Sequence, residues 1–280
     1  MAALMMAMTL LPANLFADSV EKTYLSLGAD LNKEEKATVL NLLGIEEDQL
    51  DDYELVTVTN AEELDYLDDY LNASIIGSRA LSSVLIEKKA EGNGIHVTTK
   101  NITYCTEGMY QNALTTAGIT DADITVAGPF NLTGTAALVG AMKAYEDMTG
   151  KEIEASVKDT ATNELILTGN LAEQIGGNEQ AEELIAMLKE FIAKHENPTE
   201  KEIEEAIAEG EEKLDITLTE DQKEQIESLM KKIDDLDLDV DQLKEQAKAI
   251  YQKLTDMDET GQGFIAMIKG WFEKIFDKFR

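Results

Sequence analysis

The sequence predicts an α+β protein, with a ferredoxin-like βαββαβ N-terminal domain followed by a helical C-terminal domain. Two observations support this fold class. Between residues 55 and 128, segments rich in β-branched residues alternate with segments of helical periodicity. Beyond Gly150 the apolar residues recur mainly three and four positions apart, which is typical of amphipathic helices.

The first elements follow from capping and periodicity. Asn32 and Glu35 predict a capping box at the start of a helix that ends at Gly44. The segment LVTVT, residues 55–59, is rich in β-branched residues and predicts a strand. Asn60 then caps a second helix, whose leucines recur at helical spacing.

The next two elements are predicted to form a β-hairpin. Residues 81–89 and 94–103 have strand-like composition, and the turn-forming letters AEGN join them. In this hairpin the GNG glycines serve the geometry of the turn rather than the approach of a ligand.

Three further elements complete the N-terminal domain. A helix begins at Thr106 or Glu107 and ends at Gly118, and DITVAG, residues 123–128, forms a strand. The resulting βαββαβ order is that of ferredoxin-like folds, in which two helices cover one face of an antiparallel sheet. A last helix runs from Thr133 to Gly150.

The domain boundaries follow from this change of pattern. We expect a signal peptide over 1–17, an α+β domain over 18–150, a helical domain over 151–260 and an amphipathic helix over 261–280. In the helical domain, Thr199 with Glu202 and Thr219 with Gln222 match capping boxes. The short apolar run at residues 163–169 fits either a strand or a helix.

Export is predicted from the N-terminus. The first 17 residues carry no charged side chain, and Asp18 follows directly, so cleavage is expected after Ala17. The alternative for this segment is a buried N-terminal helix. We therefore expect a secreted or extracellular protein, or one that lies peripherally at the membrane surface.

Charge and cysteine content limit the partners. The chain has 56 acidic and 24 basic residues, a formal net charge of −32, so a nucleic acid is a poor partner and an envelope component or a protein is expected. The single cysteine, Cys105, has no partner for an internal disulfide and is expected to be a small buried side chain.

The C-terminal segment has one strongly apolar helical face. On it lie Phe264, Ile268, Trp271, Phe272, Ile275, Phe276 and Phe279. Such a face packs against the helical domain or a partner, or it lies in a membrane surface.

Five residues are candidates for ligand binding. They are Arg79, His96, Thr133, Gly134 and Thr135. The last three lie in AGPFNLTGTAAL, where a strand end, a loop and a helix start present free backbone N–H groups. Each has a structural alternative: Thr133 as an ordinary N-cap, Arg79 paired with a carboxylate, and His96 as a polar residue on the sheet.

No cofactor or metal site is expected. Two histidines and one cysteine do not satisfy a tetrahedral zinc site. Alternate aspartates from Asp235 to Asp241 are similar to the start of a calcium loop, but the glycine at the sixth position and the glutamate at the twelfth are missing. An extended linker is the alternative.

Several segments resemble a known family. The segments GADLNKEE, VTVTNAEE, GSRALSS, GNGIHVTTKNIT, TAGITDADITVAGPF, GTAAL and LDLDVDQLKEQAK, spread over residues 28–248, are similar to the YpuA-type family of uncharacterised exported proteins of Gram-positive bacteria. The resemblance implies secretion and a shared two-part architecture, and it supplies no catalytic residues.

The function expected from these observations is that of an exported, non-enzymatic binding protein of the cell envelope. The alternative is a secreted hydrolase of cell-wall or peptide material, for which His96, Arg79 and Thr135 are the available constellation. Convergence of these three side chains in one pocket would favour the enzyme.

Overall fold

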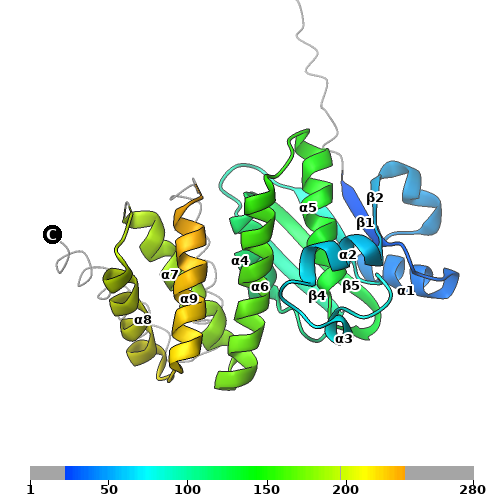
Figure 1. Ribbon diagram of the computed structural model, residues 1–280. Coiled ribbons are helices and arrows are strands. Elements are labelled where there is room, and N and C mark those ends of the chain that lie inside the picture. Colours follow the sequence, from blue (N-terminus) through cyan, green and yellow to red (C-terminus); the bar gives the residue numbers. More distant parts are fainter. Residues whose placement is uncertain (1–22, 196, 237–280) are drawn as a thin grey trace, which may run out of the picture.

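The computed structural model describes residues 23–195 and 197–236, which form a mixed α/β structure (Figure 1). Within these ranges one five-stranded sheet has the order β2-β1-β3-β5-β4. Its strands are β1 (Tyr24–Gly28), β2 (Glu54–Val58), β3 (Ser83–Lys88), β4 (Ile95–Ile102) and β5 (Ala122–Leu132).

The helices lie around the sheet and extend beyond one side of it (Figure 1). Those associated with the sheet are α1 (Lys33–Leu43), the 3-10 helix η1 (Glu47–Asp52), α2 (Asn60–Leu67), α3 (Ala73–Ile76), α4 (Glu107–Thr116) and α5 (Thr135–Thr149). The remaining helices are α6 (Ala155–Ile175), α7 (Asn178–Lys194), α8 (Glu200–Leu214) and α9 (Glu220–Asp234).

The sheet topology differs from the ferredoxin-like prediction, which requires four antiparallel strands. Strands β1 and β2 are parallel and are connected through α1, and β4 and β5 are parallel and are connected through α4. Strand β3 lies between the two pairs and is antiparallel to β1 and β5. The ferredoxin-like prediction is therefore wrong, and the strand β1 was not anticipated.

The predicted hairpin of residues 81–103 is also wrong, because β5 lies between β3 and β4. The connecting segment crosses the start of β5 instead of turning tightly. Its backbone is held there by Asp121: the N–H of Lys89 donates to the Asp121 carbonyl at 2.7 Å, and the N–H of Gly94 donates to the Asp121 side chain at 2.9 Å. Gly92 and Gly94 have φ angles of 88° and 69°, so the two glycines do serve loop geometry.

Apolar layers cover both faces of the sheet. On one face, Leu25 and Leu27 of β1 pack with buried residues of α1, including Val39 and Leu40. On the other face, alternate strand residues pack against α2, α4 and α5. Strand β1 is buried along its whole length because it is covered from both sides.

Helix α6 connects the sheet-bearing part to the other helices. Its Leu165 and Ile166 belong to the core that contains the sheet, whereas Leu167 and Leu171 belong to the core of α7, α8 and α9. Residues 163–169, which fitted either a strand or a helix, lie within α6.

A buried polar network crosses the same region. Lys189 of α7 forms an ion pair with Glu164 of α6 at 2.8 Å, and its Nζ also donates to the carbonyl of Asn112 in α4 at 2.7 Å. Thr116 of α4 donates to the other oxygen of Glu164. Because removal of one partner of a buried pair costs about 3–5 kcal/mol, this network fixes how α4, α6 and α7 meet.

The predicted helix starts are largely confirmed. Capping boxes are present at Asn32, Thr199 and Thr219. Helix α2 begins one residue earlier than expected, because Thr59, not Asn60, is its N-cap.

Three predictions concern residues outside the described ranges. They are the signal peptide at 1–17, most of the aspartate run from Asp235 to Asp241, and the apolar face at 261–280. Within the part of the chain that the structure describes, no helix is long and apolar enough to cross a membrane.

Candidate functional site

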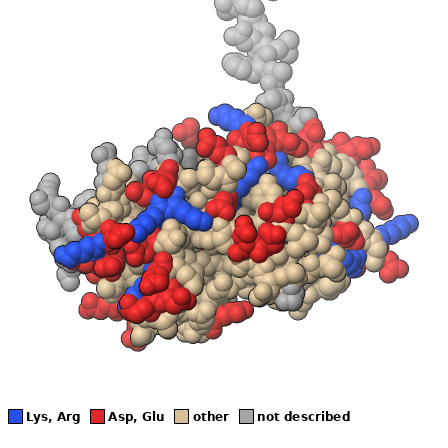
Figure 2. Space-filling view, viewed as in Figure 1, with Lys and Arg blue, Asp and Glu red and all other residues tan. Residues whose placement is uncertain are grey.

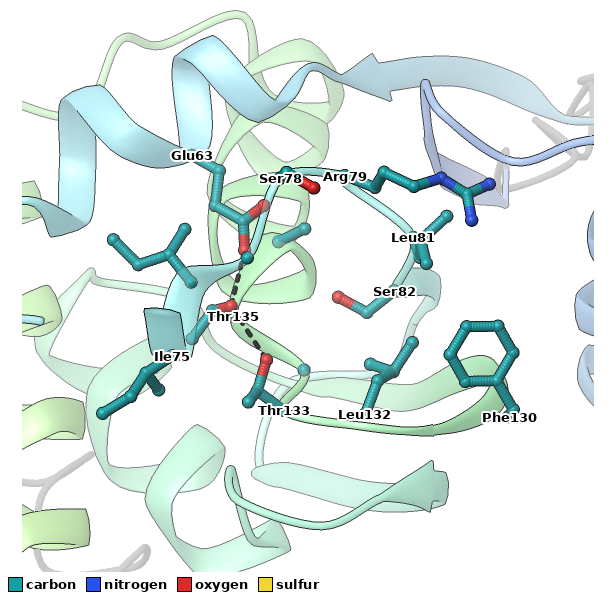
Figure 3. Close-up of a pocket in the computed structure, with 14 residues that line it drawn as sticks. Glu63, Ile75, Ser78, Arg79, Leu81, Ser82, Phe130, Leu132, Thr133 and Thr135 are labelled. Atoms are coloured by element: carbon teal, nitrogen blue, oxygen red, sulfur yellow. Dashed lines mark hydrogen bonds between the residues drawn. The ribbon is translucent and has the colours of Figure 1, made fainter. Parts of the chain in front are cut away.

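A pocket with a volume of about 330 Å³ lies where α2, α3, the loop before β3, the end of β5 and the start of α5 meet (Figure 3). We call it the Glu63 pocket. Its lining residues are Glu63, Ile75, Ile76, Gly77, Ser78, Arg79, Leu81, Ser82, Phe130, Leu132, Thr133, Gly134, Thr135 and Ala136.

The carboxyl of Glu63 is buried beside the first turn of α5, with 1% of the residue exposed. The hydroxyl of Thr135 donates to Glu63 Oε1 at 2.5 Å, and the backbone N–H of Ala136 also donates to this carboxyl. The amide of Asn60 lies 3.5 Å from Oε2. Glu63 therefore occupies the positive end of the α5 dipole, where free N–H groups would otherwise attract an anion.

Burial raises the pKa of Glu63 above its ordinary value, and the nearby Asp30 acts in the same direction. The hydrogen bonds from Thr135, Asn60 and Ala136 oppose this shift. Among the described residues no lysine or arginine forms an ion pair with Glu63. The carboxyl is thus stabilised by neutral donors alone.

The start of α5 depends on a glycine. The N-cap is Gly134, whose φ of 99° lies in the left-handed region, and it provides no side-chain cap. A Cβ at this position would lie 2.6 Å from the hydroxyl oxygen of Tyr110, which donates to the Gly134 carbonyl at 2.5 Å. The expectation that Thr133 caps this helix is therefore wrong, because the helix begins one residue later and its first N–H groups find other acceptors.

Ser82 of the loop before β3 supplies one of those acceptors. Its Oγ accepts from the N–H of Ala137 at 2.9 Å, and its hydroxyl points into the middle of the pocket in Figure 3. The hydroxyls of Thr133 and Thr135 lie 3.3 Å apart on the adjacent wall. Three hydroxyl side chains, from Ser82, Thr133 and Thr135, thus line one part of the pocket.

Arg79 is one of the lining residues, but its guanidinium points away from the centre of the pocket (Figure 3). Both of its terminal nitrogens donate to Glu35, at 3.0 and 2.5 Å, and one also donates to the carbonyl of Asp30 at 2.6 Å. The alternative that Arg79 pairs with a carboxylate is therefore confirmed. The pair ties the segment before β3 to the first turn of α1.

The pocket brings together four of the five candidate residues and leaves out His96. Arg79, Thr133, Gly134 and Thr135 all line it. His96 lies on β4 at the opposite edge of the sheet from β2, is exposed, and is in register with Asp123 of β5. The constellation of His96, Arg79 and Thr135 is therefore not assembled in this pocket.

The single cysteine lies in the buried core. Cys105 is 1% exposed, as expected, and burial raises the pKa of its thiol to about 12. Within residues 23–195 and 197–236, no group of three or more His, Cys, Asp or Glu side chains is placed to hold a metal ion.

The lining residues that the sequence did not single out include Glu63, Ser82 and Phe130. A usable signal existed for Glu63: it lies three positions after Asn60 and four before Leu67, and so shares the inward face of α2 with a fully buried leucine. A carboxylate on the apolar face of a helix has to find buried partners. Phe130, which is 50% exposed, had no such pattern.

The pocket is built from the segments that carry the family resemblance. VTVTNAEE ends at Glu63, GSRALSS spans residues 77–83, TAGITDADITVAGPF ends at Phe130, and GTAAL begins at Gly134. The family model described as "Protein of unknown function (DUF1002)" matches residues 27–250. The chain belongs to the DUF1002 family.

A second comparison agrees with this family. The DUF1002 chain is 40% identical over 262 residues to "Uncharacterized protein YpuA" of Bacillus subtilis (strain 168), an alignment that covers 93% of this chain and 87% of the relative. The resemblance to the YpuA-type family is thus confirmed. No solved structure matches the chain. Every lining residue of the pocket lies within the range that the DUF1002 model matches.

The position of Glu63 predicts a distinctive effect of substitution. Glu63→Ala removes the buried acceptor of Thr135 and Ala136 and should lower the free energy of unfolding by about 1–3 kcal/mol. Glu63→Gln keeps an acceptor oxygen and should cost less. Urea unfolding of the three proteins at pH 5 and pH 8 measures both effects.

The pH dependence has a defined sign. Because the pKa of Glu63 is raised in the folded chain, the folded state binds more protons here than the unfolded state, whose glutamate pKa is about 4.3. Wild type should therefore lose stability relative to Glu63→Gln as the pH rises from about 4.3 through the raised value. If the stability of wild type rose relative to that of Glu63→Gln between pH 5 and pH 8, the buried environment assigned to the Glu63 carboxyl would be contradicted.

Proposed function

We propose that this chain is an exported, non-enzymatic binding protein of the cell envelope that holds a small ligand in the Glu63 pocket. The observation that carries the proposal is the composition of the pocket. It combines apolar walls, including Leu81, Leu132 and Phe130, with a few polar groups fixed by hydrogen bonds. Sites for small molecules are typically concave, mostly apolar and largely preformed, with few polar groups that orient the ligand.

The volume supports a ligand of modest size. Small-molecule sites have volumes of about 300–1,000 Å³, and the Glu63 pocket, at about 330 Å³, lies at the lower end of this range. Such a space takes a small organic ligand, from a single substituted ring to a compact fused-ring dye.

The hydrolase alternative has less support from this geometry. A hydrolytic centre needs a nucleophile within hydrogen-bonding distance of a base, and the lining residues of the pocket include no histidine. The hydroxyl of Thr135 donates to Glu63, but Glu63 also accepts from the helix backbone and is held in place by it. We therefore favour binding over catalysis.

The proposed class of partner follows from charge. A net charge of −32 disfavours a nucleic acid, and Figure 2 shows acidic side chains over much of the face in view, with fewer basic ones among them. An envelope component or a protein partner is the proposed class. Contact of the segment 261–280 with a membrane surface stays a prediction about residues outside the described ranges.

Binding in the pocket is testable with the neutral, solvatochromic dye Nile red. We expect the full chain to bind Nile red with a saturable rise in emission, and Ser78→Trp to weaken that binding at least tenfold, because the indole fills the pocket at its exposed wall. Ser156→Trp, at an exposed position in the first turn of α6, is the matched control and should bind as wild type does. Equal binding by Ser78→Trp and Ser156→Trp would show that the dye binds elsewhere and would remove the support for a ligand pocket.

Export is testable separately. Because residues 1–17 carry no charged side chain and Asp18 follows, we expect protein recovered from the culture medium of its host to begin near Asp18. N-terminal sequencing gives the answer directly. An intact Met1 on soluble protein inside the cell would contradict export.

A further inference from the structure

We infer that the Glu63 pocket takes a neutral ring that bears hydroxyl groups, such as one sugar unit of an uncharged glycan, and that it excludes anions. This inference rests on the proposed function, that the pocket binds a ligand, and adds the chemical class of that ligand. Three observations support it: an occupied helix start, hydroxyl groups on one wall and an exposed aromatic ring at the edge.

The exclusion of anions follows from the groups that already occupy the positive positions. A free helix N-terminus attracts carboxylates and phosphates, but the first turn of α5 is taken by the Glu63 carboxyl and by Ser82 Oγ. The one arginine of the lining, Arg79, is engaged by Glu35 and turned away from the centre. An anionic ligand would therefore lie beside a buried carboxyl with no cation to compensate it.

The hydroxyl wall favours a polar but uncharged ligand. Ser82 and Thr133 each carry a hydroxyl that both donates and accepts hydrogen bonds, as sugar hydroxyls do. The Ser82 hydroxyl points into the pocket, and its oxygen accepts from Ala137 in a bond that does not use its proton. Glu63 is 1% exposed and acts as a positioning residue: its hydrogen bond holds Thr135 and the start of α5 in place.

Phe130 supplies the apolar surface for one face of the ring. It is 50% exposed and stands at the edge of the pocket beside Leu132 (Figure 3). A sugar ring has one face of C–H groups, which packs against an aromatic side chain, while its hydroxyls point sideways to polar partners. Leu55 on β2, 49% exposed, is the other large apolar side chain with this degree of exposure in the described part of the chain. It does not line the pocket and so provides a control.

Saturation-transfer NMR on the full chain tests the ligand class. The neutral probes are the methyl glycosides of glucose, mannose and N-acetylglucosamine, and the anionic probe of the same ring size is the methyl glycoside of glucuronic acid, which keeps its free carboxylate. We expect at least one neutral glycoside to bind and to displace Nile red, and glucuronate to bind at least tenfold more weakly. Phe130→Ala should lower the affinity for the neutral glycoside at least tenfold, whereas Leu55→Ala should leave this affinity unchanged. Glu63→Gln should reduce the difference in affinity between the neutral and the anionic probes, because it removes the carboxyl that disfavours an anion.

The outcomes separate this inference from the proposed function. If Nile red binds wild type but not Ser78→Trp, and none of the three glycosides binds, the sugar inference is overturned while the pocket remains a binding site. If neither dye nor glycoside binds in the pocket, both are overturned. The inference is also overturned if glucuronate binds as tightly as the neutral glycosides, or if Phe130→Ala leaves the affinity for the neutral glycoside unchanged.

Discussion

The hydrogen bonds between the Glu63 carboxyl and the first turn of α5 join two helices at one wall of the pocket. A buried carboxyl has to be fully hydrogen-bonded, so α2 and α5 are held in one relative position. The segment before β3 is fixed by the same kind of contact: Asn60 donates to the Gly77 carbonyl at 3.3 Å, and Asp30 accepts from the Ala80 N–H at 2.8 Å. The pocket is preformed because each of its walls is tied to a neighbour by polar groups.

The same arrangement sets the chemistry of the pocket. Glu63 accepts the hydrogen bonds that an incoming anion would need, and Glu35 neutralises the nearby arginine. What remains for a ligand is a set of hydroxyls and an apolar surface that ends at Phe130. These remaining groups can hold a neutral ring. They do not supply a nucleophile in contact with a histidine base, which a hydrolase would need.

Local sequence signals predicted much of the fold, and pairing between distant segments was where they failed. Helix starts such as those at Asn32, Thr199 and Thr219 depend on side chains three residues apart and were found. Strand β1, with the letters YLSLG, has no β-branched residue to indicate a strand, and because both of its faces are buried between helices it shows no alternation of buried and exposed positions. The hairpin prediction failed because β5, some twenty residues beyond β4, inserts between β3 and β4. The turn residues between β3 and β4 carry no information about this long-range pairing.

The candidate site shows the same limit. The segments GSRA and GTAAL were identified from their glycines and polar residues, and both line the pocket. Glu63 was missed because it is one of 56 acidic residues, and its position on the inward face of α2 is the one sequence signal that sets it apart. Ser82 was missed because its hydroxyl accepts a hydrogen bond from a helix N–H 55 residues away. No local sequence feature of a serine just before a strand indicates such a long-range contact.

The most direct test of the account is the titration of Glu63 in the full chain, followed through its side-chain carboxyl ¹³C resonance and assigned by its disappearance in Glu63→Gln. The account predicts a midpoint clearly above the value of about 4.3 found for exposed glutamates, because the carboxyl is buried and its donors are neutral. A midpoint at or below that value would mean that the carboxyl is solvated or paired with a cation, and it would contradict the description of the pocket as a neutral site.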